Sequence, residues 1–237
     1  MQSTTAPRRR STVGRRLALV VAAAAVVATS VAGTSAPATA QATRNPILFV
    51  HGYGGSAGNW NTMISRFRSA GYTSNELMAI TYNSALSNTT IAGQVRTAAD
   101  NLRSRTGAAK IDIVAHSMGS LSTRYYLKNL GGSSVVDDWV SLGGPNHGTT
   151  SALACTLISL GCVDMVAGSL FLLGLNAGDE SPGSTSYSTV WSSCDGVIIP
   201  ATSTIVSGAN NNQLGCVTHL ALLTDQTAFN RTRSLVA

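Results

Sequence analysis

The fold of this chain is decided by the stretch Ile111-Asp112-Ile113-Val114-Ala115-His116-Ser117-Met118-Gly119-Ser120. A short run rich in β-branched residues leads into Ala115, a serine follows two positions later, and Gly119 opens a segment that is compatible with a helix. This pattern is typical of a nucleophile elbow, where a strand turns sharply into a helix and holds a serine in a strained, exposed conformation. We expect Ser117 to be a nucleophile; the alternative is an ordinary serine in a strand-to-helix loop. The usual pattern has glycine at both small positions, so Ala115 adds one methyl group to it.

Apolar runs alternate with amphipathic segments on both sides of the elbow. A helix capped by Asn59 and ended by Gly71 is expected to follow the first strand. The other expected elements are strands at 45–50, 77–82, 111–114 and 135–142, helices at 90–105 and from the elbow to 130, late strand pieces at 189–191, 204–207 and 213–214 around an Asn-rich turn at 210–212, and a last helix at 220–229. This alternation predicts an α/β fold, with a mainly parallel sheet, helices on both faces and a single compact domain.

Two glycine-rich loops follow expected strands, at residues 51–55 and 143–148. In a parallel sheet the working site lies at the carboxyl ends of the strands. Both loops and the elbow come at such ends, so the sequence places the site there.

A serine hydroxyl needs a base to take its proton, and the base needs a carboxylate to orient it. The chain has four histidines that could serve as the base. His116 is adjacent to Ser117, and neighbouring side chains at an elbow diverge, while His51 and His147 lie in the glycine-rich loops. In this kind of fold the order along the chain is serine, acid, histidine. His219 alone leaves room for an acid before it, so we expect His219 to be the base.

Four carboxylates lie between the serine and this histidine: Asp164, Asp179, Glu180 and Asp195. Asp195 directly follows a strand-like segment. Asp164 instead lies in the apolar segment 151–175, and Asp179 and Glu180 lie together in a polar loop. A bridge between Cys194 and Cys216 would also join the loop of Asp195 to the loop of the histidine. We therefore expect Asp195 to be the acid.

The negative charge that forms when the serine attacks needs hydrogen-bond donors arranged in advance. The backbone N–H of Met118, directly after the nucleophile, is one candidate. The backbone N–H of Tyr53 is the other, since Gly52, Gly54 and Gly55 let that loop approach closely. An ordinary tight turn is the alternative for this loop.

The segment 151–175 is unusually apolar and is interrupted by glycines. One or two helices packed on the sheet, or an apolar surface or short lid beside the site, would both fit it. The four cysteines are Cys155, Cys162, Cys194 and Cys216, and an even number in an exported chain predicts two disulfides. Of the three possible pairings we favour Cys155–Cys162 and Cys194–Cys216. Zinc ligation is the alternative, but the sequence contains no CxxC spacing.

A leader peptide is expected at residues 1–40, with the mature domain at 41–237. Five arginines precede an apolar run at 17–31, and Ala38-Thr39-Ala40 offers the small residues that a signal peptidase reads. This run is short for a membrane span, which needs about 20 residues; an uncleaved anchor is the alternative. Without these arginines the charges nearly balance, so the basic composition gives no support for nucleic-acid binding.

Several of these segments together carry a family resemblance. They are 47–55 (ILFVHGYGG), 111–119 with its Ala-His-Ser-Met-Gly elbow, 125–130 (YYLKNL), 141–144 (SLGG), 193–197 and 217–223 (VTHLALL). In them the chain resembles the class 2 lipases, the small secreted bacterial lipases of the Bacillus lipase A type and their actinobacterial relatives. The resemblance implies a minimal α/β-hydrolase fold, a triad of Ser117, Asp195 and His219, and oxyanion donors at Tyr53 and Met118.

The same resemblance implies hydrolysis of carboxylic esters, including acylglycerols, through an acyl-enzyme and without an organic cofactor. A cutinase-like polyesterase and a lipid acyltransferase are the alternative enzymes, and a catalytically silent lipid-binding protein is the alternative from another class. We expect a secreted, extracellular monomer that acts on a lipid or other ester, including one at a lipid–water interface, without metal, nucleic acid or stable membrane insertion. The four cysteines and the insertion at 151–175 depart from the smallest members of the family.

Overall fold

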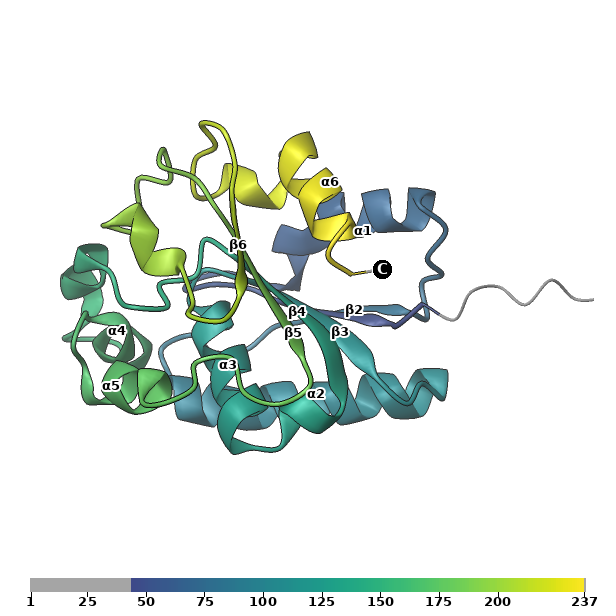
Figure 1. Ribbon diagram of the computed structural model, residues 1–237, viewed down its shortest axis with the longest axis horizontal. Helices are drawn as coiled ribbons and strands as arrows, with labels where there is room; N and C mark the ends of the chain where they lie inside the picture. The colour runs from purple at the N-terminus through teal and green to yellow at the C-terminus, as the bar shows by residue number, and fades with distance from the viewer. Residues whose placement is uncertain (1–43, 237) are drawn as a thin grey trace, which may run out of the picture. The chain divides into compact units, whose positions relative to one another are not determined.

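The computed structural model describes residues 44–236, so the expected leader at 1–40 lies outside the described residues. Six parallel strands form one sheet in the order β2-β1-β3-β4-β5-β6 (Figure 1). The strands are β1 Ile47–Val50, β2 Leu77–Ile80, β3 Ile111–His116, β4 Val136–Leu142, β5 Ser186–Trp191 and β6 Asn210–Gln213. The α/β fold with a parallel sheet is therefore confirmed.

Helices cover both faces of the sheet (Figure 1). One face carries α1 (Asn61–Ser69) and α6 (Gln226–Arg233), and the other carries α2 (Asn88–Thr106) and α3 (Gly119–Asn129). The strand sequences fit this arrangement because successive side chains point to opposite faces. In β1, Ile47 and Phe49 enter the core beneath α1 and α6, while Leu48 and Val50 enter the core beneath α2 and α3. All four are fully buried, as a central parallel strand requires.

Helix ends follow their capping residues. The Ser87 hydroxyl accepts a hydrogen bond from the Thr90 N–H, and α2 therefore begins two residues before its expected start. Gly107, with φ 71°, ends α2 as expected. Asn59 does not cap α1; it lies in a short 3₁₀ turn at Ala57–Trp60 that precedes this helix.

The expectation for residues 204–214 was wrong. The asparagine run is itself strand β6, and the segment before it contains a 3₁₀ turn at Ala201–Thr204. This strand pairs with β5 alone, at the edge of the sheet, and its amide side chains add contacts that a propensity argument ignores. Thr189 donates its hydroxyl to Asn211 Oδ1 at 2.8 Å, and Asn212 Nδ2 donates to the Thr189 carbonyl at 3.2 Å.

The expected last helix at 220–229 is in fact two elements. A 3₁₀ turn at Ala221–Leu223 is followed by α6, which starts late because Asp225 caps it. The Asp225 carboxylate accepts a hydrogen bond from the Ala228 N–H at 2.9 Å.

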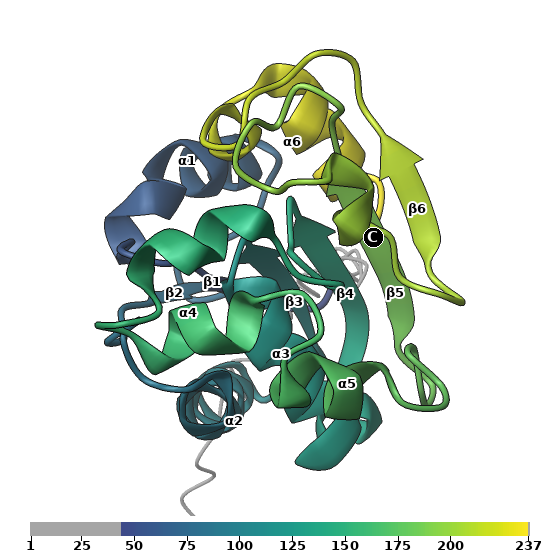
Figure 2. The same ribbon diagram turned by 90° about the vertical axis from the view of Figure 1, so that its left-hand side faces the viewer.

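The apolar insertion forms a 3₁₀ turn at Thr150–Cys155 and two short helices, α4 (Leu160–Met165) and α5 (Leu170–Asn176). Figure 2 looks onto the end of the sheet where α4 and α5 lie. The base of the insertion is fastened to the start of α2, because Asp164 Oδ2 accepts the Asn88 N–H at 2.7 Å and the Leu160 N–H donates to the Ala85 carbonyl at 2.9 Å. The segment therefore contains two short helices, as expected, and they pack on α2 and α3. Within residues 44–236, every helix is too short or too polar to cross a membrane.

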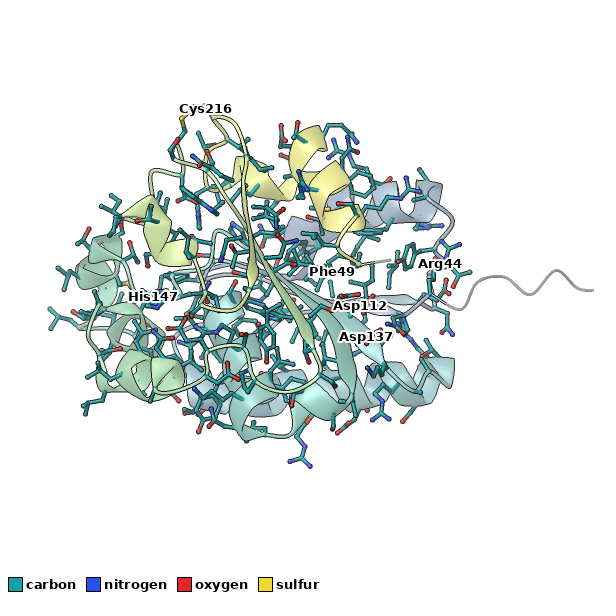
Figure 3. The ribbon with its side chains drawn as sticks, viewed as in Figure 1. Arg44, Phe49, Asp112, Asp137, His147 and Cys216 are labelled. Carbon is teal, nitrogen blue, oxygen red and sulfur yellow. A yellow bond between two sulfur atoms is a disulfide. The ribbon has the colours of Figure 1, made fainter. Side chains whose placement is uncertain are left out.

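A buried carboxyl lies at the other end of the sheet. Figure 3 shows Asp112 and Asp137 at the end away from His147. Asp112 Oδ1 accepts hydrogen bonds from Asn45 Nδ2 at 3.1 Å and from the Asp138 N–H at 3.2 Å, but Oδ2 has no partner among the described residues. Burial and the neighbouring Asp138 raise the pKa of Asp112 to about 7.

The raised pKa predicts how stability depends on pH. Between about pH 4 and pH 7 the folded protein retains a proton on Asp112 that the unfolded chain has released, so the free energy of unfolding falls as the pH rises through this window. Asp112→Asn keeps a neutral group of the same shape and should flatten this fall. One pKa unit corresponds to about 1.4 kcal/mol, so the variant should be more stable than the parent protein by a few kcal/mol at pH 8.

Urea unfolding between pH 4 and pH 8 measures this difference. Asp100→Asn, which removes an exposed carboxylate from α2, is the matched control and should leave the pH dependence unchanged. Equal slopes for Asp112→Asn and the parent protein would contradict the assignment.

Candidate functional site

Ser117 lies in the sharp turn between β3 and α3. Its φ of 53° makes it the one non-glycine residue with a left-handed backbone conformation in the described part of the chain. The Ser117 N–H donates to the Leu142 carbonyl at 2.9 Å, which ties the turn to the end of β4. A Cβ atom on Gly119 would collide with the carbonyl oxygens of Val50 and His51. The turn therefore needs glycine at 119, and the sequence pattern of the elbow has its expected geometry.

The loop after β1 lies directly against this serine. A Cβ atom on Gly52 would be 2.6 Å from Ser117 Cβ and 3.2 Å from Ser117 Oγ. The absence of a side chain at this position leaves room for the hydroxyl. It also brings the backbone of residues 52–54 beside the serine.

Asp195 and His219 are hydrogen bonded to each other. His219 Nδ1 donates to Asp195 Oδ2 at 2.8 Å, and the His219 N–H donates to the Asp195 carbonyl at 2.9 Å. The other carboxylate oxygen accepts the N–H groups of Val197 at 3.0 Å and Ile198 at 2.7 Å. Burial alone would raise the pKa of Asp195, but the hydrogen bonds from His219 and the two backbone N–H groups lower it below its ordinary value. The carboxylate is therefore ionised at neutral pH.

A disulfide joins the two loops that carry this pair. Cys194 is bonded to Cys216, and a second disulfide joins Cys155 to Cys162, so both expected pairings are present. Cys194 is adjacent to the aspartate, and Cys216 lies three residues before the histidine. The crosslink therefore fixes the acid loop to the histidine loop on the outer side of the site.

A cavity of about 470 Å³ opens at this end of the sheet. Ser117, His219 and Tyr53 line it together, with Ala152 and Cys155 of the insertion on another wall. No hydrogen bond between the described residues joins the Ser117 hydroxyl to His219, although both groups face the same cavity. Hydrogen bonds of this kind are often long in enzymes without substrate and shorten when substrate binds.

Two backbone N–H groups beside the serine have no hydrogen-bond partner among residues 44–236. They belong to Tyr53 and Met118, the two positions expected to donate to a developing oxyanion. The next N–H, that of Gly54, donates to Ser84 Oγ at 2.8 Å and so holds the loop in place. The side chain of Met118 is buried, with its sulfur close to Gly161 of α4.

The other histidines and carboxylates that the sequence offered have different partners. His51 is buried, donates from Nδ1 to the Gly52 carbonyl at 2.7 Å and accepts the Tyr82 N–H at 3.2 Å, and burial lowers its pKa. His147, labelled in Figure 3, pairs with Glu180 at 3.0 Å on the exposed side of its loop. Asp164 fastens the insertion, and Asp179 accepts the Ser181 N–H at 3.0 Å. None of these contacts involves Ser117.

Thr149 also belongs to the site, although the sequence did not indicate it. Thr149 lines the cavity, donates its hydroxyl to the Val197 carbonyl at 2.8 Å and accepts the Ile199 N–H at 2.9 Å. It thereby ties the loop after β4 to the acid loop. Its position directly after the glycine-rich loop at 143–148 was the available signal, but the partner lies almost 50 residues later.

Comparison with known structures agrees with this architecture. The Bacillus licheniformis lipase BlEst2 in its mature form is similar with a TM-score of 0.71 at 18% sequence identity, covering 82% of this chain and 92% of that one. Aspergillus fumigatus lipase B is similar with a TM-score of 0.68 at 20% identity, covering 80% of this chain but 51% of that one. The α/β hydrolase MGS-MChE2, from a sediment metagenome of the Mar Chica lagoon, has a TM-score of 0.59 at 18% identity, covering 81% and 89%. At these identities the likeness concerns the fold, which is that of the α/β hydrolases.

The sequence itself carries the family assignment. The family model described as "Lipase (class 2)" matches residues 44–227, which is nearly all of the part that the structure describes. This match includes the elbow, the acid loop and the histidine loop. The chain belongs to the class 2 lipase family.

Proposed function

We propose that this protein is a secreted serine ester hydrolase that cleaves carboxylic esters of lipids through an acyl-enzyme on Ser117. The observation that carries the proposal is the shared cavity, which is lined both by a serine on a left-handed turn and by a histidine already bonded to a buried carboxylate. The expected leader at 1–40 and the two disulfides support export.

In the proposed reaction, Ser117 Oγ attacks the ester carbonyl while His219 Nε2 takes its proton. Asp195 holds the imidazole with Nδ1 protonated and stabilises the imidazolium that forms. The free N–H groups of Tyr53 and Met118 donate to the oxyanion. His219 then protonates the leaving alcohol, and water releases the acid by the same steps in reverse order.

The surface around the cavity supports a lipid substrate. Eleven large apolar side chains are exposed in the described part of the chain, all on segments at the carboxyl end of the sheet: Tyr53, Leu153, Leu157, Ile158, Leu160, Val163, Leu170, Leu173, Val197, Ile199 and Leu220. Segment 148–178, which carries seven of them, has Asp164 as its one charged residue. An uncharged apolar surface of this kind suits contact with acyl chains or a neutral lipid interface.

A panel of esters tests the reaction class. Rates on short soluble esters, emulsified long-chain triacylglycerol and a polyester film separate an esterase, a lipase and a polyesterase. Product analysis with an added alcohol detects acyl transfer. We expect hydrolysis of acylglycerol to exceed both polymer cleavage and transfer, and an inactive protein on all esters would refute the proposal.

Replacing the proposed nucleophile tests the reaction. Ser117→Ala should lower kcat on a soluble ester by about 10⁴-fold or more, because the acyl-enzyme can no longer form. Ser69→Ala, on an exposed part of α1, is the control and should leave kcat unchanged. Retention of hydrolysis in the purified Ser117→Ala protein would refute the triad.

Adding a charge to the apolar surface tests the proposed contact with lipid. The Leu157 side chain is 99% exposed, so Leu157→Asp should fold normally. Its rate on emulsified triacylglycerol should fall by roughly tenfold, because a carboxylate must lose its hydration to contact the lipid. Its rate on a short soluble ester should remain unchanged.

Ser69→Asp adds the same charge on a distant helix and is the matched control. It should behave like the parent protein on both substrates. An equal loss on the soluble ester and the emulsion for Leu157→Asp would show that this position affects the chemistry rather than lipid contact.

A further inference from the structure

His116, directly before the serine, contacts the main chain of His219. Its Nε2 atom lies 3.0 Å from the His219 carbonyl oxygen, and the centroids of the two rings are 4.5 Å apart. The His116 side chain is 3% exposed and forms part of the cavity lining. Residues that are 103 positions apart in the chain are thereby joined beside the nucleophile.

Among the described residues, the other hydrogen bonds of His219 are to Asp195. The backbone N–H of His219 donates to the Asp195 carbonyl, and the ring Nδ1 of His219 donates to the Asp195 carboxylate. The bond from His116 holds the carbonyl side of the same backbone. This hydrogen bond links the histidine loop to the end of β3, where the serine turn begins. The disulfide and Asp195 fix His219 to the acid loop, but they do not fix it to Ser117.

The protonation state of His116 follows from this contact. A carbonyl oxygen can only accept, so Nε2 carries the proton. Burial, together with the neighbouring His219, lowers the pKa of His116 to about 3, although the bond to the His219 carbonyl and the charge of Asp195 act in the opposite direction. His51 is the other titratable group that faces it, and it also disfavours a charge. His116 is therefore neutral when His219 takes a proton, and it adds no repulsion to the imidazolium.

We propose that His116 is a positioning residue that holds His219 at the distance and orientation needed to take the proton of Ser117. It acts through the hydrogen bond from its Nε2–H to the His219 carbonyl, and it does not exchange a proton with the serine itself. This inference rests on the proposed function, because it assigns a support to the base of that reaction. It gives the histidine of the Ala-His-Ser-Met-Gly elbow a role that its spacing alone does not reveal.

Two amide substitutions separate this role from simple filling of space. His116→Gln can place an N–H close to the position of the imidazole Nε2, whereas His116→Asn is one methylene shorter and cannot reach the His219 carbonyl. With a short soluble ester, His116→Asn should lower kcat by about 10- to 100-fold with little change in KM, because small misplacements of a catalytic group have effects of this size. His116→Gln should retain kcat to within about threefold.

Thermal unfolding and labelling of Ser117 by a fluorophosphonate establish that each variant is folded and how many sites are active. Equal kcat values for the two folded variants, or a change confined to KM, would overturn the inference. If His116→Asn does not fold, His116→Gln decides: a folded protein with full kcat supports the role, and one with a tenfold loss refutes it. A parent protein that the fluorophosphonate does not label, with an active Ser117→Ala variant, would instead refute the proposed function.

Discussion

The strained turn at Ser117 is the constraint on which the rest of the structure depends. A serine in the left-handed region costs roughly 1–3 kcal/mol and persists only where its surroundings leave no alternative. Here the N–H of the residue is bonded to the end of β4, and Gly119 packs against the last carbonyls of β1. Both neighbouring strands of β3 therefore hold the turn. A parallel sheet with β3 between β1 and β4 is the arrangement that makes this possible.

The proposed base and acid are held in a different way. Asp195 and His219 lie on irregular loops after β5 and β6, where no regular ladder of hydrogen bonds fixes them. Their positions depend on the disulfide between Cys194 and Cys216, on backbone N–H groups that hold the carboxylate, and on Gly143. A Cβ atom at Gly143 would lie 3.0 Å from Asp195 Oδ2 and 3.2 Å from His219 Nδ1. The framework of the site is thus made of strand ends on one side and of crosslinked loops on the other.

The sequence predicted the central part of the fold well because its signals are local. A few neighbouring residues were enough to predict the buried strand at 47–50, the elbow and the helix end at Gly107. The asparagine strand β6 was mistaken for a turn because its stability comes from Thr189 on another strand. Chain order and cysteine spacing brought Asp195 and His219 together in the prediction, and the structure places them in contact. The bond from His116 to the His219 backbone could not be predicted, since no periodicity or spacing relates these positions.

The Cys155–Cys162 bridge closes a small loop at the tip of the insertion. Leu157 and Ile158 project from this loop, while its base is held by Asn88 and Ala85. Gly161 of the same ring lies against the sulfur of Met118 in the serine turn, whereas Leu157 and Ile158 are exposed and lie outside the cavity lining. Substitution of these two residues would therefore change which surroundings the protein first touches, without disturbing the residues that line the cavity behind them.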